Sequence, residues 1–132
     1  MATTAAEPHW VDRMVVEAVQ LDLIREHGGW PGLRDEQGLE SALARPRQRY
    51  ASAPTTDLVR LAAVYGHGLA TSCPFNDGSK RIAFVTMTVF LGLNGQSVEA
   101  PEPEVVTVML GLSAGEIGEE DLAAWLRSRL RA

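Results

Sequence analysis

Apolar residues recur along the chain at intervals of three and four positions, and Gly and Pro interrupt this pattern. Such spacing places one apolar stripe on each of a series of helices. We predict helices over residues 11–26, 35–44, 57–72, 79–94, 104–113 and 119–131, with loops between them, including residues 45–56. A brief strand is compatible with residues 96–98 or with the N-terminal segment.

Capping and breaking residues set the ends of these helices. Gly28 ends the first helix, and Pro46 ends the second because proline interrupts the helical hydrogen bonds. Thr56 is the predicted N-cap of the third helix, which Pro74 closes. Gly95 is the predicted left-handed C-cap of the fourth.

The fourth helix is apolar almost all round between residues 82 and 93. A helix without a polar face is buried on all sides. We therefore predict an all-α fold of about six helices around this central helix, in one domain over residues 1–132. The last helix ends in Arg127, Arg129 and Arg131, cations that suit the negative end of a helix dipole.

Composition narrows the class of protein. The chain has 132 residues, of which 45% are hydrophobic, enough for one core and too many for a disordered chain. No apolar run approaches the roughly 20 residues of a membrane helix. Residues 1–8 lack the basic and apolar segments of a secretory signal. The one cysteine, Cys73, cannot form a disulfide within the chain and fits a reducing cytoplasm.

Charge is unevenly distributed in a chain of net charge −5. Residues 45–81 carry six basic and two acidic side chains, and the remainder is strongly acidic. This distribution argues against general nucleic-acid binding, which needs a broad basic face, but suits a small anion such as a nucleotide phosphate. The alternative is that Arg45, Arg47 and Arg49 form a solvated loop edge.

The segment with candidate chemistry is residues 73–81, between the third and fourth helices. Amides at the start of a helix lack intrahelical partners and attract anions. Gly78 allows a tight turn, Lys80 and Arg81 add positive charge, and Asp77 offers a carboxylate to a phosphate-bound Mg²⁺. The alternative is an ordinary turn with a helix-capping acid and two surface cations. No Walker loop is present.

These residues, Cys73-Pro-Phe-Asn-Asp-Gly-Ser-Lys-Arg81, resemble the Fic/Doc motif, His-x-Phe-x-(Asp/Glu)-(Gly/Ala)-Asn-(Gly/Lys)-Arg. Residues 28–46 and 90–95 resemble flanking segments of Doc-type (death-on-curing) proteins. The resemblance implies the Fic fold in its compact Doc form. Lys80 before the motif Arg, and Phe84 where AMP-transferring members carry a second Arg, favour the Doc branch.

The Doc branch implies a bacterial toxin that transfers phosphate from ATP to a protein hydroxyl, with a translation elongation factor as the family target. It also implies an antitoxin partner whose disordered tail folds on the toxin, and neither nucleic-acid nor membrane binding by the chain itself. By the same resemblance Asp77 holds Mg²⁺ and Phe75 is a buried anchor. The implied nucleotide-binding residues are Asn76, Gly78, Ser79, Lys80 and Arg81, the last two being catalytic together with Asp77.

Two positions depart from the motif. Ser79 replaces the Asn, and Cys73 replaces the His that takes the proton from the attacking hydroxyl. General-base catalysis contributes about 10²–10⁴-fold, and an ordinary thiol is mostly protonated at neutral pH. His67, six positions earlier, lies on another side of its helix and is a poor substitute. We interpret His9 and His27 as surface residues.

Three explanations of Cys73 stay open. The protein has lost the activity, the sequence was altered to remove toxicity, or Cys73 itself acts as base or nucleophile. Alternative functions are an AMP-transferring enzyme and a catalytically inactive module that binds nucleotide or antitoxin.

Overall fold

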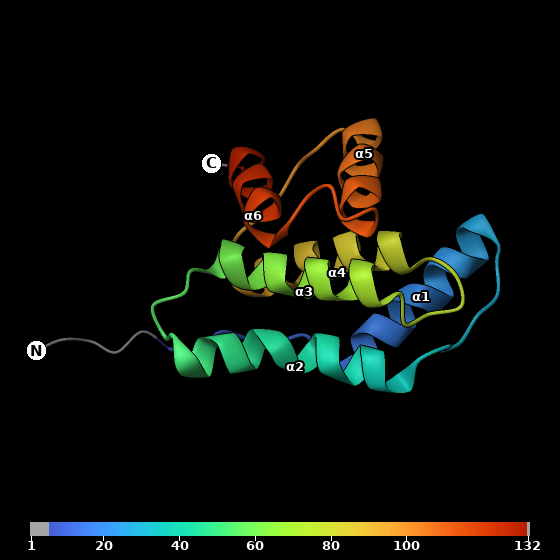
Figure 1. Cartoon of the computed structure of the whole chain (residues 1–132), viewed down its shortest axis with the longest axis horizontal. Coiled ribbons are helices and arrows are strands. Elements are labelled where there is room, and N and C mark those ends of the chain that lie inside the picture. The colour runs from blue at the N-terminus through green and yellow to red at the C-terminus, as the bar shows by residue number, and fades with distance from the viewer. Residues whose placement is uncertain (1–5, 132) are drawn as a thin grey trace, which may run out of the picture.

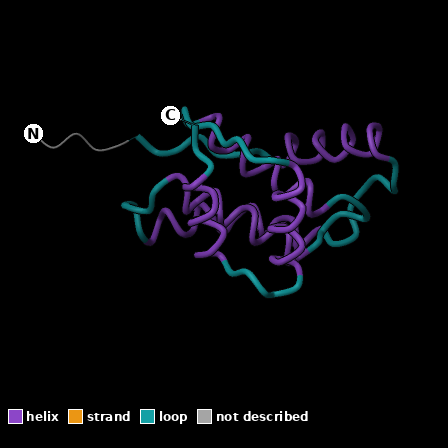
Figure 2. The backbone as a smooth tube through the Cα atoms, turned by 90° about the horizontal axis from the view of Figure 1, so that it is seen from above, coloured by secondary structure: helices purple, strands orange, loops and turns teal. Residues whose placement is uncertain are grey.

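Six helices make up the fold: α1 (Arg13–His27), α2 (Glu36–Ser52), α3 (Leu58–Ser72), α4 (Ser79–Leu93), α5 (Glu102–Ser113) and α6 (Glu119–Ser128). The computed structural model describes residues 6–131, so the predicted ends of the domain and most of the segment searched for a signal lie outside it. The all-α prediction is confirmed, and Figure 2 shows helices joined by loops over the described residues. No helix in this part of the chain is long and apolar enough to cross a membrane.

The central helix is α3, and the prediction that the fourth helix is central is wrong. Figure 1 shows α3 between α2 on one side and α5 and α6 on the other, with α4 packed behind it. The buried residues of α3 lie all round it, from Val59 to Ala70, whereas Leu93 of α4 is 49% exposed. Gly66 and Gly68 let neighbouring helices approach α3 closely, whereas several apolar positions of α4 are only partly buried.

The contact between α3 and α4 depends on Gly66. A Cβ at this position would lie 2.2 Å from the sulfur and 2.8 Å from Cγ of Met87, which is fully buried. Glycine therefore permits a helix approach that any larger residue would obstruct. Because the loop between these two helices carries the candidate site, this contact also fixes the position of the site.

Helix α2 extends well past its predicted end. Pro46 lies inside it, and the predicted loop over residues 45–56 is helical as far as Ser52. An interior proline costs about 3 kcal/mol or more. The buried positions Leu39, Ala42, Leu43 and Pro46 nevertheless share one face, which packs on α3. Gly68 permits this packing, since a Cβ there would lie 3.3 Å from that of Ala42. Burial along this face offsets the proline.

Several predicted helix ends also shift. Asp57, rather than Thr56, caps α3, because its carboxylate accepts from the Arg60 amide at 2.8 Å. Asn94, rather than Gly95, is the C-cap of α4, and Gly95 follows it in the predicted left-handed conformation, with φ 84°. The expected short strand near residue 98 is a single antiparallel bridge, between Val98 and Leu130.

The C-terminal arginines do more than complement a helix dipole. Helix α6 ends at Ser128, so of the three only Arg127 lies in its last turn. The guanidinium of Arg129 instead donates to Glu104 of α5 at 2.6 Å, and Arg131 pairs with Glu99 at 3.2 Å. These arginines therefore tie the end of the chain to the segments before it.

Aromatic packing ties the segment before α1 to the core. Trp10 stacks on Phe90 with ring centroids 5.8 Å apart, and Phe90 lies 5.1 Å from the Tyr65 ring. The Tyr65 hydroxyl accepts a hydrogen bond from the Val11 amide at 3.1 Å, and burial raises the pKa of this phenol.

An ion-pair network joins α2, α3 and α6. The Glu119 carboxylate accepts from Arg49 at 2.8 Å and from Arg60 at 3.0 Å. Burial raises the pKa of Glu119, but the hydrogen bonds from both arginines outweigh burial and hold the pKa below its usual value. Glu119 is therefore committed to these two cations as an ionised group.

We expect Gly66→Ala to lower the free energy of unfolding by about 1–3 kcal/mol, because Met87 must leave its rotamer to admit the new methyl group. Urea unfolding measures this change. Gly92→Ala, in the interior of α4 with open space around it, is the matched control and should be neutral or stabilising by up to about 1 kcal/mol. Equal effects of the two substitutions would contradict a close α3–α4 approach.

Candidate functional site

The loop between α3 and α4 begins at a strained residue. Cys73 is the C-cap of α3 with φ 45° and ψ 58°, and among the described residues it is the one non-glycine with positive φ. Its amide still donates to the Leu69 carbonyl at 3.2 Å, which closes the helix. The left-handed turn redirects the chain into Pro74 and so separates the motif from α3.

Backbone pairing holds this loop against the connection between α1 and α2. The amides of Arg34 and Asp35 donate to the Pro74 carbonyl at 2.8 and 3.0 Å, and the Asn76 amide donates to the Gly32 carbonyl at 3.0 Å. Phe75, which forms an antiparallel bridge with Leu33, is 2% exposed and belongs to the core. Phe75 is therefore buried, as an anchor residue must be, and its anchoring role stays a prediction.

Gln20 of α1 clamps the two loops together. Its side-chain amide donates to the carbonyls of Gly32 at 3.2 Å and of Trp30 and Asp77 at 3.4 Å, and its oxygen accepts from the Gly32 amide at 2.9 Å. Gln20 is 2% exposed. This role of Gln20 was not predicted from the sequence. A polar residue four positions after Val16, in the apolar stripe of α1, is a signal that could have indicated it.

Asp77 lies on the surface with one carboxylate oxygen turned toward the neighbouring loop. Its Oδ2 accepts from the Trp30 amide at 2.8 Å, and Oδ1 accepts no hydrogen bond from the described residues. Gly29, with φ 115°, makes this approach possible, since a Cβ there would lie 3.1 Å from that of Asp77. The carboxylate is thus held in place while one oxygen stays open to a ligand.

The start of α4 has the features of an anion site. Gly78, the N-cap, has φ 85° and provides no side-chain cap. The amides of residues 78–81 find no acceptor within the described residues, and the first bonded amide is that of Ile82. Ser79 is buried, and its hydroxyl accepts from the Phe75 amide at 3.3 Å, while the Asn76 side chain donates to the Pro31 carbonyl. The side chains of Ser79 and Asn76 therefore stabilise the loop, and the backbone amide of Ser79 stays free.

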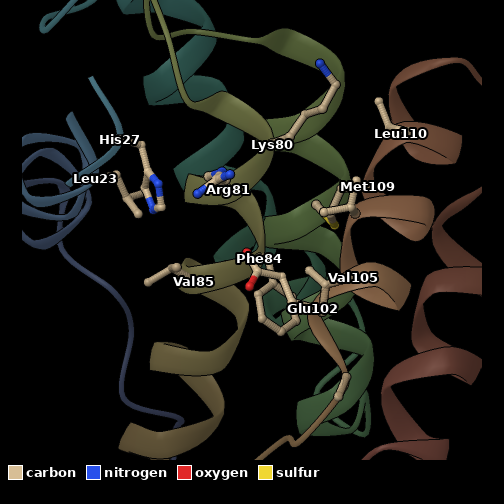
Figure 3. A pocket seen from close by; sticks show the side chains of 12 residues that line it. Leu23, His27, Lys80, Arg81, Phe84, Val85, Glu102, Val105, Met109 and Leu110 are labelled. Atoms are coloured by element: carbon tan, nitrogen blue, oxygen red, sulfur yellow. The ribbon is translucent and has the colours of Figure 1, made fainter. Parts of the chain in front are cut away.

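Lys80 and Arg81 are exposed and form no ion pair within the described residues. Both line a pocket of about 430 Å³ between α1, α4 and α5. Figure 3 shows the Lys80 and Arg81 side chains pointing in different directions, with Arg81 beside His27, and with Phe84 and Val85 of α4 and Val105 and Met109 of α5 around the pocket. His27, interpreted from sequence as a surface residue, also lines it. The remaining lining residues are Leu23, Phe84, Val85, Ala100, Glu102, Val105, Val106, Met109 and Leu110.

The Cys73 thiol is half-buried and donates to the Ala70 carbonyl at 3.1 Å. A group that accepts a proton must present a free lone pair, so this thiol would have to leave Ala70 to act as a base. His67 does not replace it, because His67 lines a different pocket, between α2, α3 and α6.

Comparison with known proteins shows the family of this chain. Residues 10–91, which include α1 to α3, most of α4 and the loop described above, match the Fic/DOC family. The chain belongs to this family. It is also 35% identical over 104 residues, 79% of its length, to the Doc protein kinase of Escherichia phage P1, of which the match covers 82%. The Fic/DOC match ends within α4, so α5, which forms one wall of the pocket, lies outside it.

In this Fic/DOC chain we expect Gln20→Ala to lower the free energy of unfolding by about 1–3 kcal/mol, because the Gly32 amide loses its acceptor. Hydrogen exchange should rise in residues 29–34 and 76–78, and mass spectrometry measures it. Gln37→Ala, on the exposed face of α2, is the control and should change neither quantity. Unchanged exchange in Gln20→Ala would show that the loops hold together without this clamp.

Proposed function

We propose that this protein is a Doc-type phosphotransferase that binds ATP and Mg²⁺ at the start of α4 and whose transfer activity is weak or absent because Cys73 occupies the general-base position. The observation that carries the proposal is the row of free amides at residues 78–81, with Asp77 before them and Lys80 and Arg81 among them. Free amides and two cations suit a polyphosphate, and the helix dipole adds to their attraction.

The adjoining pocket suits the rest of a nucleotide. Its volume of about 430 Å³ lies within the range of about 300–1,000 Å³ common for small-molecule sites. Lys80 and Arg81 line it, and Phe84, Val85 and Met109 supply apolar surface. We therefore place the phosphates at the start of α4 and the base and ribose in the pocket.

Asp77 fits the role of magnesium ligand. Mg²⁺ is commonly held by one or two carboxylates together with substrate phosphates and water. Asp77 offers an oxygen without a hydrogen bond from the described residues, beside the amides that would hold the phosphates. When bound, the ion would neutralise charge on the phosphates, while this chain's own amides and cations orient them.

The substrate would be a protein hydroxyl, with a translation elongation factor as the family target. The hydroxyl oxygen bonds to the γ-phosphorus of ATP as the bond between that phosphorus and ADP breaks. The hydroxyl proton passes to the side chain at position 73. The Cys73 thiol fits that last role poorly, because it donates its own hydrogen to Ala70. This contact supports the further proposal that the chain retains binding and has lost most of the chemistry.

We expect Cys73→His to raise phosphate transfer by about 10²–10⁴-fold and to slow growth of a bacterium that expresses it, because imidazole supplies the missing base. Transfer of label from γ-labelled ATP to a translation elongation factor measures the gain. The control is Asp77→Asn in the Cys73→His background, which keeps an acceptor for the Trp30 amide but removes the charge. It should abolish the gain.

The other outcomes select the alternatives. Label arriving only from α-labelled ATP would show AMP transfer. Calorimetric binding of ATP–Mg²⁺ without any transfer by Cys73→His would contradict the lost-base explanation and leave a nucleotide-binding module. No binding and no transfer would contradict both.

We further propose an antitoxin partner, which the Doc likeness implies. Leu110 of α5 is 53% exposed and Val106 is 46% exposed, and both border the nucleotide pocket. Lys80 and Arg81 lie at the same pocket. This combination suits an amphipathic segment with apolar and acidic side chains, and such a segment would also cover the entrance of the pocket.

The test of this partner uses the product of a small reading frame next to the gene. We expect that product to co-purify with this chain and to compete with ATP–Mg²⁺. Leu110→Ser should weaken the complex at least tenfold, since it removes an exposed apolar contact without disturbing the core. Leu93→Ser, equally exposed on α4 and absent from the pocket lining, is the matched control. Equal losses in the two variants would place the partner elsewhere.

A further inference from the structure

A second pocket lies across α3, away from the motif loop. Its volume is about 380 Å³, and its walls come from the second half of α2, the middle of α3 and the first residue of α6. These three helices lie in that order in Figure 1. Its lining is mostly polar: Arg45, Gln48, Arg49, Ser52, Val64, His67 and Glu119.

The cations of this pocket are not all neutralised. Glu119 is committed to Arg49 and Arg60, so it does not compensate the remaining charge. Arg45 forms no ion pair within the described residues. The imidazole of His67 likewise has no hydrogen-bond partner there. Two donors, from α2 and α3, therefore face the same space without an acceptor.

The continuation of α2 beyond Pro46 creates this arrangement. Arg45, Gln48, Arg49 and Ser52 are spaced by three and four positions, so they share one face of the last turns of the helix. A loop over residues 45–56, as predicted from the sequence, would not align these four side chains. The pocket is thus a consequence of the continuation of α2 through Pro46 to Ser52.

We propose that this pocket binds a small phosphorylated molecule with a hydroxyl-bearing organic part. A phosphate matches the guanidinium of Arg45 and the imidazole of His67, since both donate hydrogen bonds to anionic oxygens. The volume exceeds that of a phosphate alone, and Gln48 and Ser52 offer polar contacts to hydroxyl groups. This pocket is separate from the one beside the start of α4, because the two pockets share no lining residue.

The experiment titrates the full chain with inorganic phosphate and with ribose 5-phosphate while backbone amide signals are followed by NMR. We expect saturable shifts in residues 45–52 and 64–67, with at least tenfold tighter binding of the sugar phosphate. Arg45→Gln and His67→Gln should each weaken that binding at least tenfold. Arg25→Gln, which removes one positive charge from a 78% exposed side chain of α1, is the matched control and should change it less than twofold.

Other results would overturn the assignment. Shifts confined to residues 77–81 would show that phosphate binds at the start of α4 alone. Equal weakening by Arg25→Gln and Arg45→Gln would reduce the effect to net charge. Equal affinity for inorganic phosphate and ribose 5-phosphate would contradict recognition of the organic part of the ligand. Because Arg81→Gln acts at the other site, it should leave the shifts in residues 45–52 unchanged, and the two sites can be tested separately.

Discussion

The candidate site depends on the backbone pairing between the loop after α1 and the loop before α4. The carbonyls of Pro74 and Gly32 accept the backbone hydrogen bonds between the loops, and the Gln20 side chain is hydrogen-bonded to both loops. These bonds do not involve the amides of residues 78–81, which have no acceptor within the described residues and so stay available to a ligand. A side-chain cap at position 78 would compete for those amides, and glycine there provides none.

This pairing is in turn set by the packing around α3. Gly66 brings α4 close, Gly68 brings α2 close, and Phe75 inserts into the core between the two loops. The position of the free amides is therefore fixed by small residues in the middle of the fold rather than by the charged residues that would bind a ligand. The charged residues can act only because buried contacts have already oriented the backbone that carries them.

Much of this arrangement could be predicted from the sequence, because helix periodicity and Gly or Pro breaks are local signals. The bounds of the two helices around the motif were correct to within a residue, and the motif runs from the end of α3 into the first turn of α4. Two of the errors share one cause: Pro46 is tolerated because its face is buried on α3, and α3 is central because helices pack on several sides of it, closely at Gly66 and Gly68. Both facts are properties of tertiary packing, which overrides local preference. Gln20 was missed for the same reason, since its partners lie 10, 12 and 57 residues away.

In the proposed function, binding and chemistry depend on different groups of the site, the main chain at the start of α4 and the side chain at position 73. The candidate anion site consists of main-chain amides whose positions depend on Gln20, Phe75 and Gly78, and the Cys73 thiol forms no hydrogen bond with any of these three residues. The Cys73 thiol contributes only a hydrogen bond to Ala70, at the end of α3. A change of side chain at that position can therefore remove a base without disturbing the site for phosphate. A nucleotide bound in such a protein would be held and oriented as in an active enzyme, yet the proton of an attacking hydroxyl would have no acceptor at position 73 while the thiol keeps its hydrogen bond.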